Sequence, residues 1–236
     1  MTGVSSSARK PLVPNGGERA IARSYDAIAE RYAEQFADEL EVKELDRAML
    51  DELATRARGH GPVADVGCGP GQAAGHLAAR GLDVVGVDIS PKMLEIAREA
   101  HPEVAFREGS MLALPAGRGD WAAIVALYAI LHLDEAQLQR AFAEFARVLR
   151  PGGLLLVSVH VGRERRREER WWGMPAELTG YFHDPDELEE LMVRAGFTIE
   201  RTERRPPYPG EYPSERCYVL ARRDSPAPVA SPNSQG

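Results

Sequence analysis

The sequence of 236 residues predicts an α/β fold, a doubly wound Rossmann-like sheet that is mostly parallel. Segments with apolar residues at helical spacing alternate along the chain with short apolar runs. The run at 121–128 is almost wholly apolar, which is typical of a strand with both faces covered by helices. A glycine-rich segment directly follows the first of these runs, at the strand end where such folds bind their ligands.

The first half of the chain predicts two helices followed by an alternating series. Residues from Ile21 to Phe36 recur at helical spacing, so an amphipathic helix opens the ordered part. A second helix is expected over Val42–Arg58. Strands are then predicted at 63–66, 82–87 and 104–106, and a helix at 72–80. Ser90 and Pro91 start a further helix, because a hydroxyl cap precedes a first-turn proline.

The second half continues the alternation. After the strand at 121–128, Asp134 and Gln137 form a capping box for a helix that ends before Pro151. A buried strand is predicted at 154–159. Asp184 caps the last helix, which ends at Gly196. Two final strands are predicted at 197–202 and 216–221.

The segment 161–183 separates the fifth strand from the last helix and is expected to form a lid. Its five arginines alternate with glutamates, which favours a solvated helix with ion pairs between neighbouring turns. The alternative is that one or two arginines bind an anionic acceptor. The lid also carries aromatic residues that are expected to line an apolar or aromatic pocket, with core packing as the alternative: Trp171, Trp172, Tyr181 and Phe182.

Composition restricts the class of protein. The net charge of -7 disfavours a nucleic-acid binder, which needs a basic face. Two cysteines are too few for a disulfide framework, and no apolar run approaches the length of a membrane helix. We expect a cytoplasmic protein with a flexible start at 1–17, a single domain at 18–223 and a disordered tail at 224–236.

The glycine-rich segment has the spacing G-x-G-x-G, at Gly67, Gly69 and Gly71. A dinucleotide-binding loop would read G-x-G-x-x-G, and Gln72 occupies its last position. Asp65, two residues before the first glycine, is a poor neighbour for a pyrophosphate and suits a cationic group such as an amino-acid ammonium. These features disfavour a nicotinamide-dependent oxidoreductase, although glycines in structural turns alone would give a similar pattern.

Two further strand ends carry polar groups. Asp88 ends the second strand about 20 residues past the glycines, where a carboxylate can accept hydrogen bonds from ribose hydroxyls. The alternative is that Asp88 only precedes the Ser90 cap. After the third strand, the backbone N–H groups of 109–111 could meet an adenine edge.

Three segments, VADVGCGPGQAAGHLAARG, VVGVDISPKMLEIAR and VLRPGGLLLVSVH, resemble the motifs of class I S-adenosylmethionine-dependent methyltransferases. The resemblance extends from about Ser24 to Arg222. It implies a seven-stranded sheet whose last strand is antiparallel, a helical N-terminal cap, and S-adenosyl-L-methionine as the cofactor.

The resemblance also implies roles for single residues. Asp65 and the backbone of 67–69 would surround the methionine part of the cofactor, and Asp88 would hold the ribose. Tyr25 and Tyr32 match a Y-x-x-x-A-x-x-Y helix that closes over the cofactor, with core packing as the alternative. The expected cofactor site comprises Tyr25, Tyr32, Asp65, Gly67, Cys68, Gly69, Gly71, Asp88, Ile89, Ser90, Met93, Gly109, Ser110, Met111, Leu112, Leu127 and Tyr128.

One position departs from the family pattern. Many relatives carry Asp at position 110, where it accepts a hydrogen bond from the adenine amino group, and this chain has Ser110. A hydroxyl can still accept, but less strongly than a carboxylate.

Histidines are the candidates for a general base, because their pKa lies near neutral pH. His132 follows the fourth strand and His160 ends the fifth, so both are expected at the ligand-binding edge. His183 is a third candidate and lies just before a helix cap. Each could instead be a cap or a packed polar residue. The other three histidines are expected to be solvated.

Missing motifs narrow the acceptor class. No Asn/Asp-Pro-Pro-Tyr of a DNA or protein amide N-methyltransferase follows the fourth strand, and neither cysteine follows a proline, as a cytosine C5 enzyme would need. The acidic ligands of a metal-dependent catechol-type enzyme are also missing after the fourth strand, so no metal is expected. The sequence therefore predicts methyl transfer by in-line displacement to O or N of a small organic acceptor, with release of S-adenosylhomocysteine. The alternatives are a tRNA or protein methyltransferase and a catalytically silent cofactor-binding module. The sequence makes no prediction of oligomeric state.

Overall fold

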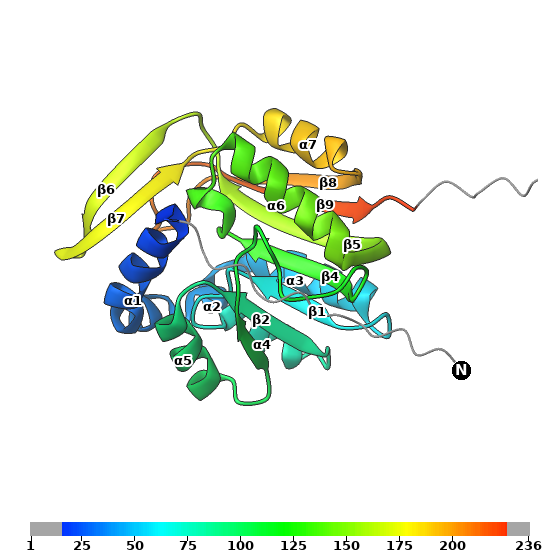
Figure 1. Ribbon diagram of the computed structural model, residues 1–236, viewed down its shortest axis with the longest axis horizontal. Helices are drawn as coiled ribbons and strands as arrows, with labels where there is room; N and C mark the ends of the chain where they lie inside the picture. The colour runs from blue at the N-terminus through cyan, green and yellow to red at the C-terminus, as the bar shows by residue number, and fades with distance from the viewer. Residues whose placement is uncertain (1–15, 226–236) are drawn as a thin grey trace, which may run out of the picture.

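The computed structural model describes residues 16–225, and its centre is a seven-stranded sheet in the order β3-β2-β1-β4-β5-β9-β8 (Figure 1). The strands are β1 Val63–Val66, β2 Val84–Asp88, β3 Ala105–Glu108, β4 Trp121–Leu127, β5 Leu149–His160, β8 Phe197–Arg205 and β9 Arg216–Arg223. All neighbours pair in parallel except β9, which is antiparallel to both β5 and β8. The predicted doubly wound, mostly parallel sheet with an antiparallel last strand is confirmed.

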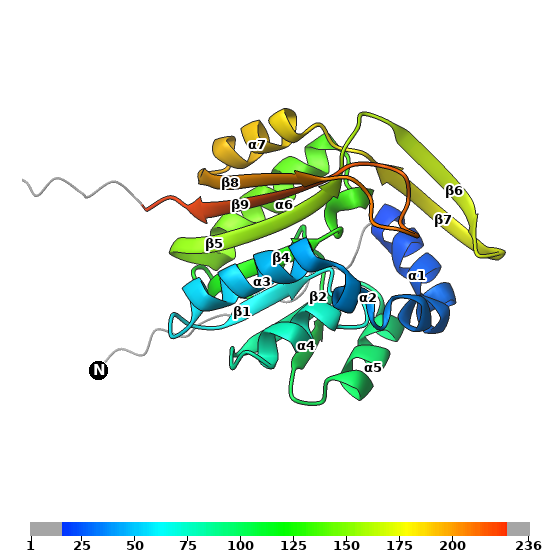
Figure 2. The same ribbon diagram turned by 180° about the vertical axis from the view of Figure 1, so that it is seen from behind.

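Helices cover both faces of the sheet. They are α1 Gly16–Phe36, α2 Glu39–Val42, α3 Glu44–Ala57, α4 Gln72–Ala78, α5 Pro91–Ala100, α6 Glu135–Val148 and α7 Pro185–Arg194, with a short 3-10 turn η1 at Ile130–His132. Figure 1 looks onto α6 and α7, and Figure 2 onto α3 and α4 on the opposite face. Each face has its own apolar core, one around Phe142 and Phe145 of α6 and one around Leu50 and Leu53 of α3.

The ends of the chain differ slightly from expectation. Helix α1 begins at Gly16, so residues 16 and 17 of the start expected to be flexible are helical. The rest of that start, 1–15, and the tail at 226–236 lie outside the described residues. No helix within 16–225 combines the length and the apolar character needed to cross a membrane.

The second predicted helix, 42–58, is found as α3, and a short helix that was not predicted, α2, precedes it and includes Val42. Lys43 lies between them with φ -94° and ψ 81°, outside the helical region. Its ammonium group forms an ion pair with Glu39 at 2.5 Å, one turn earlier. Glu39 and Leu40 of α2, together with Lys43, line a cavity at the carboxyl edge of the sheet.

The lid segment forms a β-hairpin, so the expected solvated helix is wrong. Strands β6 Arg165–Trp171 and β7 Met174–Tyr181 pair in antiparallel and extend past α1 (Figure 1). Trp172 and Gly173 connect them with φ of 50° and 83°, the two positive values that a tight hairpin turn requires. Ala176 and Leu178 of β7 are buried, whereas the arginines of β6 are exposed. Burial of alternate residues of β7 therefore outweighs the helical charge pattern of β6.

Candidate active site

A cavity of about 380 Å³ opens at the carboxyl edge of the parallel strands. Its walls come from α1, α2, α3, the loops after β1, β2, β3 and β4, the hairpin and the loop between β8 and β9. Sixteen of the predicted site residues line it: Tyr25, Tyr32, Asp65, Gly67, Cys68, Gly69, Asp88, Ile89, Met93, Gly109, Ser110, Met111, Leu127, Tyr128, His132 and His160. The fold thus brings most of the predicted site together.

The glycine loop after β1 turns sharply at two positive-φ residues. Gly67 has φ 73°, and a Cβ there would lie 2.5 Å from Cβ of Ala129, so only glycine fits. Gly69 has φ 52°, and no atom lies within 4 Å of the place its Cβ would take. The loop backbone is held by the next strand, because the N–H of Gly67 donates to the Val87 carbonyl at 2.7 Å. The structure therefore leaves open space beside Gly69 for a ligand that approaches the backbone.

Asp65 of β1 presents a buried carboxylate to the cavity. The side chain is 3 % exposed, and within residues 16–225 its Oδ2 has no hydrogen-bond partner. Burial raises the pKa of this carboxyl to about 7, opposed by a hydrogen bond from the Ala74 N–H, and the charge of Asp88 adds to the rise. A buried carboxylate oxygen without a partner is costly. It fits a cationic ligand group such as the ammonium of S-adenosylmethionine.

Asp88, at the end of β2, connects the loops after β1 and β2 through hydrogen bonds. Its Oδ2 accepts from the Gly69 N–H at 2.8 Å, and its Oδ1 accepts from the Ser90 N–H at 2.8 Å. Burial raises the pKa of Asp88, while these backbone hydrogen bonds lower it. A carboxylate offers about four acceptor positions, and the backbone N–H groups of Gly69, Ser90 and Ile89 take three of them, so one remains for a hydroxyl group in the cavity.

At the third strand end, Ser110 is bound by a residue that the sequence analysis did not identify. The Ser110 hydroxyl donates to Glu18 of α1 and accepts from the Leu112 N–H at 3.0 Å. Glu18 is 9 % exposed and lines the cavity. The two residues are 92 positions apart, and Glu18 lies just before the aromatic pattern by which α1 was predicted.

Two predicted cofactor residues, Gly71 and Ser90, have structural positions outside the cavity lining. Gly71 has φ 91° and is the N-cap of α4, with a ring carbon of His101 3.0 Å from the place of its Cβ. Ser90 is fully buried and caps α5. Its hydroxyl accepts from the Met93 N–H at 3.2 Å and donates to Asp26 at 2.6 Å. Both residues shape the backbone beside the cavity.

Leu112 and His183 also lie outside the lining. Leu112 is part of the apolar core. His183 precedes α7, and its backbone N–H donates to the His160 carbonyl at 2.9 Å. Its imidazole is mostly buried, which lowers its pKa to about 4, and a hydrogen bond to the backbone of Ile130 opposes that shift. His183 therefore belongs to the packing around the end of β5 and not to the wall that a ligand would touch.

His132, in the 3-10 turn after β4, connects α1 to the hairpin. Its Nε2 lies 2.8 Å from the Tyr25 hydroxyl, and its Nδ1 lies 2.7 Å from the Thr179 carbonyl. A carbonyl only accepts, so Nδ1 carries the proton and Nε2 accepts from Tyr25. Burial lowers the pKa of His132 to about 4, and burial raises the pKa of Tyr25. Both groups are therefore neutral near pH 7.

His160 lies at the other side of the cavity. Its Nδ1 is 2.8 Å from the Ser214 hydroxyl, and its ring packs against Tyr128 and Tyr212 at centroid distances of 5.6 and 6.0 Å. Burial lowers the pKa of His160 to about 4, and the charge of Arg216 lowers it further. Among the three candidate histidines, His132 is the one hydrogen-bonded to a hydroxyl of α1, that of Tyr25.

An aromatic wall of the cavity is made of Tyr25, Tyr32 and Phe36 of α1 and Trp171 of the hairpin strand β6. The rings of Tyr25 and Tyr32 each lie 6.0 Å from that of Trp171 in edge-to-face arrangements. Tyr32 and Phe36 are 4.6 Å apart. The lid therefore contributes an aromatic side chain to the cavity, and the exposed arginines of β6 do not line it.

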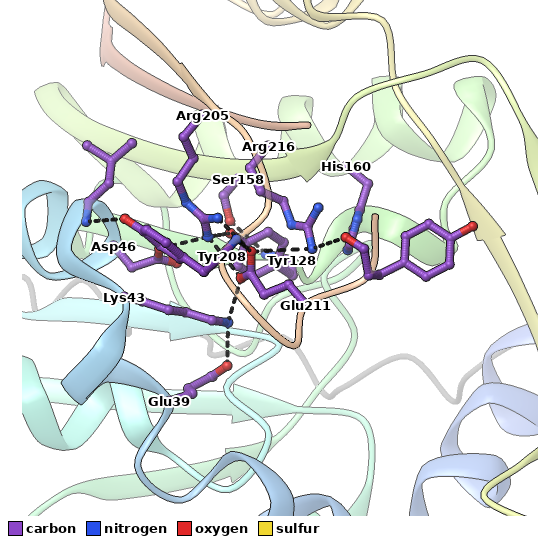
Figure 3. Close-up of polar contacts among 12 residues, drawn as sticks. Glu39, Lys43, Asp46, Tyr128, Ser158, His160, Arg205, Tyr208, Glu211 and Arg216 are labelled. Carbon is purple, nitrogen blue, oxygen red and sulfur yellow. Dashed lines mark hydrogen bonds and ion pairs between the residues drawn. The ribbon is translucent and has the colours of Figure 1, made fainter. Parts of the chain in front are cut away.

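The far end of the cavity is a charged cluster, defined here as Glu39, Lys43, Asp46, Arg205, Glu211 and Arg216 (Figure 3). Arg205 binds Glu211 through two nitrogens at 2.6 and 2.9 Å and reaches Asp46 at 3.3 Å. Lys43 lies between Glu39 at 2.5 Å and Glu211 at 3.6 Å. Burial raises the pKa of Glu211, but the hydrogen bonds of Arg205 and Tyr208 lower it to about 2.

Two tyrosines connect this charged cluster to the sheet. The Tyr218 hydroxyl donates to Asp46 at 2.6 Å and lies 2.6 Å from the Tyr128 hydroxyl. Arg205 donates to Tyr218 at 2.9 Å through Nε. The loop between β8 and β9 is thereby held over the cavity, where Gly210, Glu211 and Tyr212 contribute lining atoms.

Comparisons with known proteins agree with this arrangement. The family model "Methyltransferase domain" matches residues 63–153. An uncharacterized methyltransferase of Synechocystis sp. is 35 % identical over 149 residues, which cover 59 % of this chain and 68 % of that protein. A "Probable S-adenosylmethionine-dependent methyltransferase" of Mycolicibacterium smegmatis is 30 % identical over 192 residues, covering 78 % of this chain and 70 % of that protein.

A solved structure supports the fold. Magnesium protoporphyrin IX methyltransferase of Synechocystis, with bound S-adenosylhomocysteine, superposes with a TM-score of 0.66 at 18 % identity, over 88 % of this chain and 100 % of that chain. The described residues also fit the cofactor, since Asp65 offers an unsatisfied carboxylate oxygen and Gly69 faces open space. The predicted resemblance is confirmed: the chain belongs to the class I S-adenosylmethionine-dependent methyltransferases.

Proposed function

We propose that this enzyme transfers a methyl group to an oxygen or nitrogen of a small organic acceptor, by in-line displacement with release of S-adenosylhomocysteine. The observation that carries the proposal is the chain of hydrogen bonds from Tyr25 through His132 to the Thr179 carbonyl at the cavity wall. Bound S-adenosylmethionine supplies a methyl group on a sulfonium, whose displacement needs alignment and exclusion of water. The residues of the cavity have to orient the acceptor and take its proton.

The proton path follows from the tautomer of His132. Because the Tyr25 hydroxyl donates its hydrogen bond to Nε2, the lone pairs of the Tyr25 oxygen can accept a hydrogen bond from the hydroxyl or amino group of the methyl acceptor. As the acceptor loses its proton to the Tyr25 oxygen, the original Tyr25 proton passes to Nε2. The Thr179 carbonyl then stabilises the resulting imidazolium through Nδ1–H. In this path His132 is the final base that holds the proton, and Tyr25 is the residue that contacts the methyl acceptor.

The low pKa of His132 favours oxygen over nitrogen as the methylated atom. A base with a pKa of about 4 cannot deprotonate an alkylammonium before attack. A hydroxyl group becomes strongly acidic as its oxygen forms the new bond to carbon, so a weak base suffices at that moment. We therefore favour a phenol or another hydroxyl compound as the acceptor.

The walls of the cavity support a flat acceptor without net charge. Tyr32, Phe36 and Trp171 present aromatic surface. The lining cations Lys43 and Arg216 each face the carboxylate of Glu211, at 3.6 and 3.7 Å, so the charged end is balanced within the protein. The binding of an anionic acceptor by the lid arginines loses its support, because these arginines are exposed and none of them lines the cavity.

The test is a methyl-transfer screen with labelled cofactor over four acceptor classes: phenols, carboxylic acids, amines and bulk tRNA. Label transferred to a phenol, with S-adenosylhomocysteine formed in equal amount, supports the proposal. Transfer to tRNA alone would establish a nucleic-acid methyltransferase instead. Tight binding of S-adenosylhomocysteine without transfer to any acceptor would indicate a catalytically silent cofactor-binding module.

A further inference from the structure

We propose that Glu18 of α1 is the adenine-recognition residue of this enzyme, and that its carboxylate accepts a hydrogen bond from the exocyclic amino group of the base. The inference depends on the cofactor of the family and is independent of the acceptor proposed above. It explains how the chain can lack the carboxylate at position 110 and still distinguish adenine from other bases.

The order of the strands fixes the direction of the cofactor. β1, β2 and β3 lie side by side, and their carboxyl ends carry Asp65, Asp88 and Ser110 in that order. In S-adenosylmethionine the ribose lies between the amino-acid part and the adenine. With the ammonium at Asp65 and the ribose at Asp88, the adenine extends toward the end of β3. It then reaches the part of the cavity lined by Gly109, Ser110 and Glu18.

Glu18 has the geometry of a fixed recognition group. Its side chain is 9 % exposed, and the Ser110 hydroxyl donates to its Oε1, so the carboxylate is held at the cavity wall. Ser110 is fixed in turn by the Leu112 N–H, at 3.0 Å. A carboxylate offers about four acceptor positions, so it can accept from an amino donor while it accepts from Ser110. Ser110 thus positions the carboxylate of Glu18.

The helix that carries Glu18 lines the cavity over a length that would match the adenosyl part of the cofactor. Glu18, Ile21 and Tyr25 follow one another at spacings of three and four residues, so they share one face of α1, and all three line the cavity. Seven residues of helix span about 10 Å, which is about the length of a nucleoside. Glu18 at the β3 end and Tyr25 beside His132 therefore fit the two ends of one bound adenosyl group.

The experiment compares S-adenosylhomocysteine with S-inosylhomocysteine, in which a carbonyl oxygen replaces the amino group, by titration calorimetry. The wild-type protein should bind the adenosyl ligand about 10- to 100-fold more tightly, because the inosyl oxygen would face a carboxylate. Glu18→Gln should reduce this ratio to about threefold or less, since an amide can donate to the inosyl oxygen. Glu30→Gln, at an exposed position of the same helix, should keep the wild-type ratio.

A complementary variant guards against a change in folding. Ser110→Asp combined with Glu18→Gln supplies a carboxylate from the β3 loop and should restore the preference for the adenosyl ligand. The proposal is overturned if Glu18→Gln weakens both ligands equally, because Glu18 would then only close the cavity. It is also overturned if the wild-type protein does not discriminate between the two ligands. Neither result depends on finding a methyl acceptor, so the two proposals can fail separately.

Discussion

The hydroxyl of Tyr25 lies 2.8 Å from Nε2 of His132, across 107 positions of sequence. The contact joins the N-terminal helix to the turn after β4, and the Thr179 carbonyl on the hairpin fixes the other ring nitrogen. Three elements that the sequence presents separately thus form one hydrogen-bonded chain. The proposed proton transfer depends on all three.

Removing the Tyr25 hydroxyl should separate catalysis from cofactor binding. Tyr25→Phe retains the ring packing but interrupts the path from acceptor to His132, so we expect kcat to fall by about 100-fold or more. The affinity for S-adenosylhomocysteine should change by less than about threefold. Tyr181→Phe makes the same chemical change on the hairpin, outside the cavity lining, and serves as the control. A Tyr25→Phe enzyme with wild-type kcat would remove the hydroxyl from the mechanism.

The pH dependence of kcat should report the pKa of His132. The imidazole must be neutral to accept a proton, and burial lowers its pKa to about 4. Activity should therefore be constant from about pH 6 to 8 and fall only as pH decreases toward about 4. An inflection near the ordinary histidine value of about 6.5 would contradict this assignment. The measurement is a pH–rate profile at saturating cofactor, with pH stability checked in parallel.

Asp65→Asn should stabilise the protein without cofactor. The folded-state pKa of Asp65 is about 7, above the unfolded value of about 3.9, so the folded state binds the proton more tightly. The carboxyl therefore costs increasing stability as pH rises from about 4 to 7, and the cost is constant above that range. We expect the variant to gain about 2 kcal/mol at pH 8 and about 1 kcal/mol or less at pH 4.5.

Urea unfolding at the two pH values measures this effect, and Asp38→Asn at an exposed position is the control. The same substitution should weaken binding of S-adenosylhomocysteine, because an amide does not compensate an ammonium charge. A gain in stability that is equal at both pH values would show that the Asp65 charge is not its source.

Arg205→Met should strongly destabilise the protein. Arg205 is 6 % exposed and pairs with both Asp46 and Glu211, so its removal takes a cationic partner from the buried Asp46 and from the partly buried Glu211. Breaking a buried ion pair on one side costs about 3–5 kcal/mol. Arg170→Met, on the exposed strand β6, should change the free energy of unfolding by less than about 0.5 kcal/mol. Comparable midpoints of urea unfolding for the two variants would refute a stabilising role of this charged cluster.

Local patterns were sufficient to predict the sheet and the strand ends that carry the site. Periodicity and caps placed the strands and helices within a few residues, for example the capping box at Asp134 and Gln137, which the structure contains. The glycine spacing and the acids Asp65 and Asp88 are local signals too. Because parallel strands end at one edge, these signals converge on one cavity without knowledge of tertiary contacts.

Contacts between distant segments could not be read in this way. Glu18 and Ser110, or Asp46 and Arg205, are paired only through the fold, and neither pair has a local pattern. The hairpin did carry a signal: Gly173 follows Trp172, and Pro175 disfavours a helix interior. The dense alternation of arginine and glutamate outweighed that signal in the prediction, although exposed charges contribute little to either structure.

The position of α1 bears on how the enzyme exchanges its ligands. The single helix α1 lines the cavity at the ends of two strands, with Glu18 at Ser110 after β3 and Tyr25 at His132 after β4. If α1 moves as one body when the cavity opens for ligand exchange, the Tyr25 hydroxyl separates from His132 in the same movement. Under the proposed mechanism the open enzyme would then lack the hydrogen bond through which the proton of the methyl acceptor leaves.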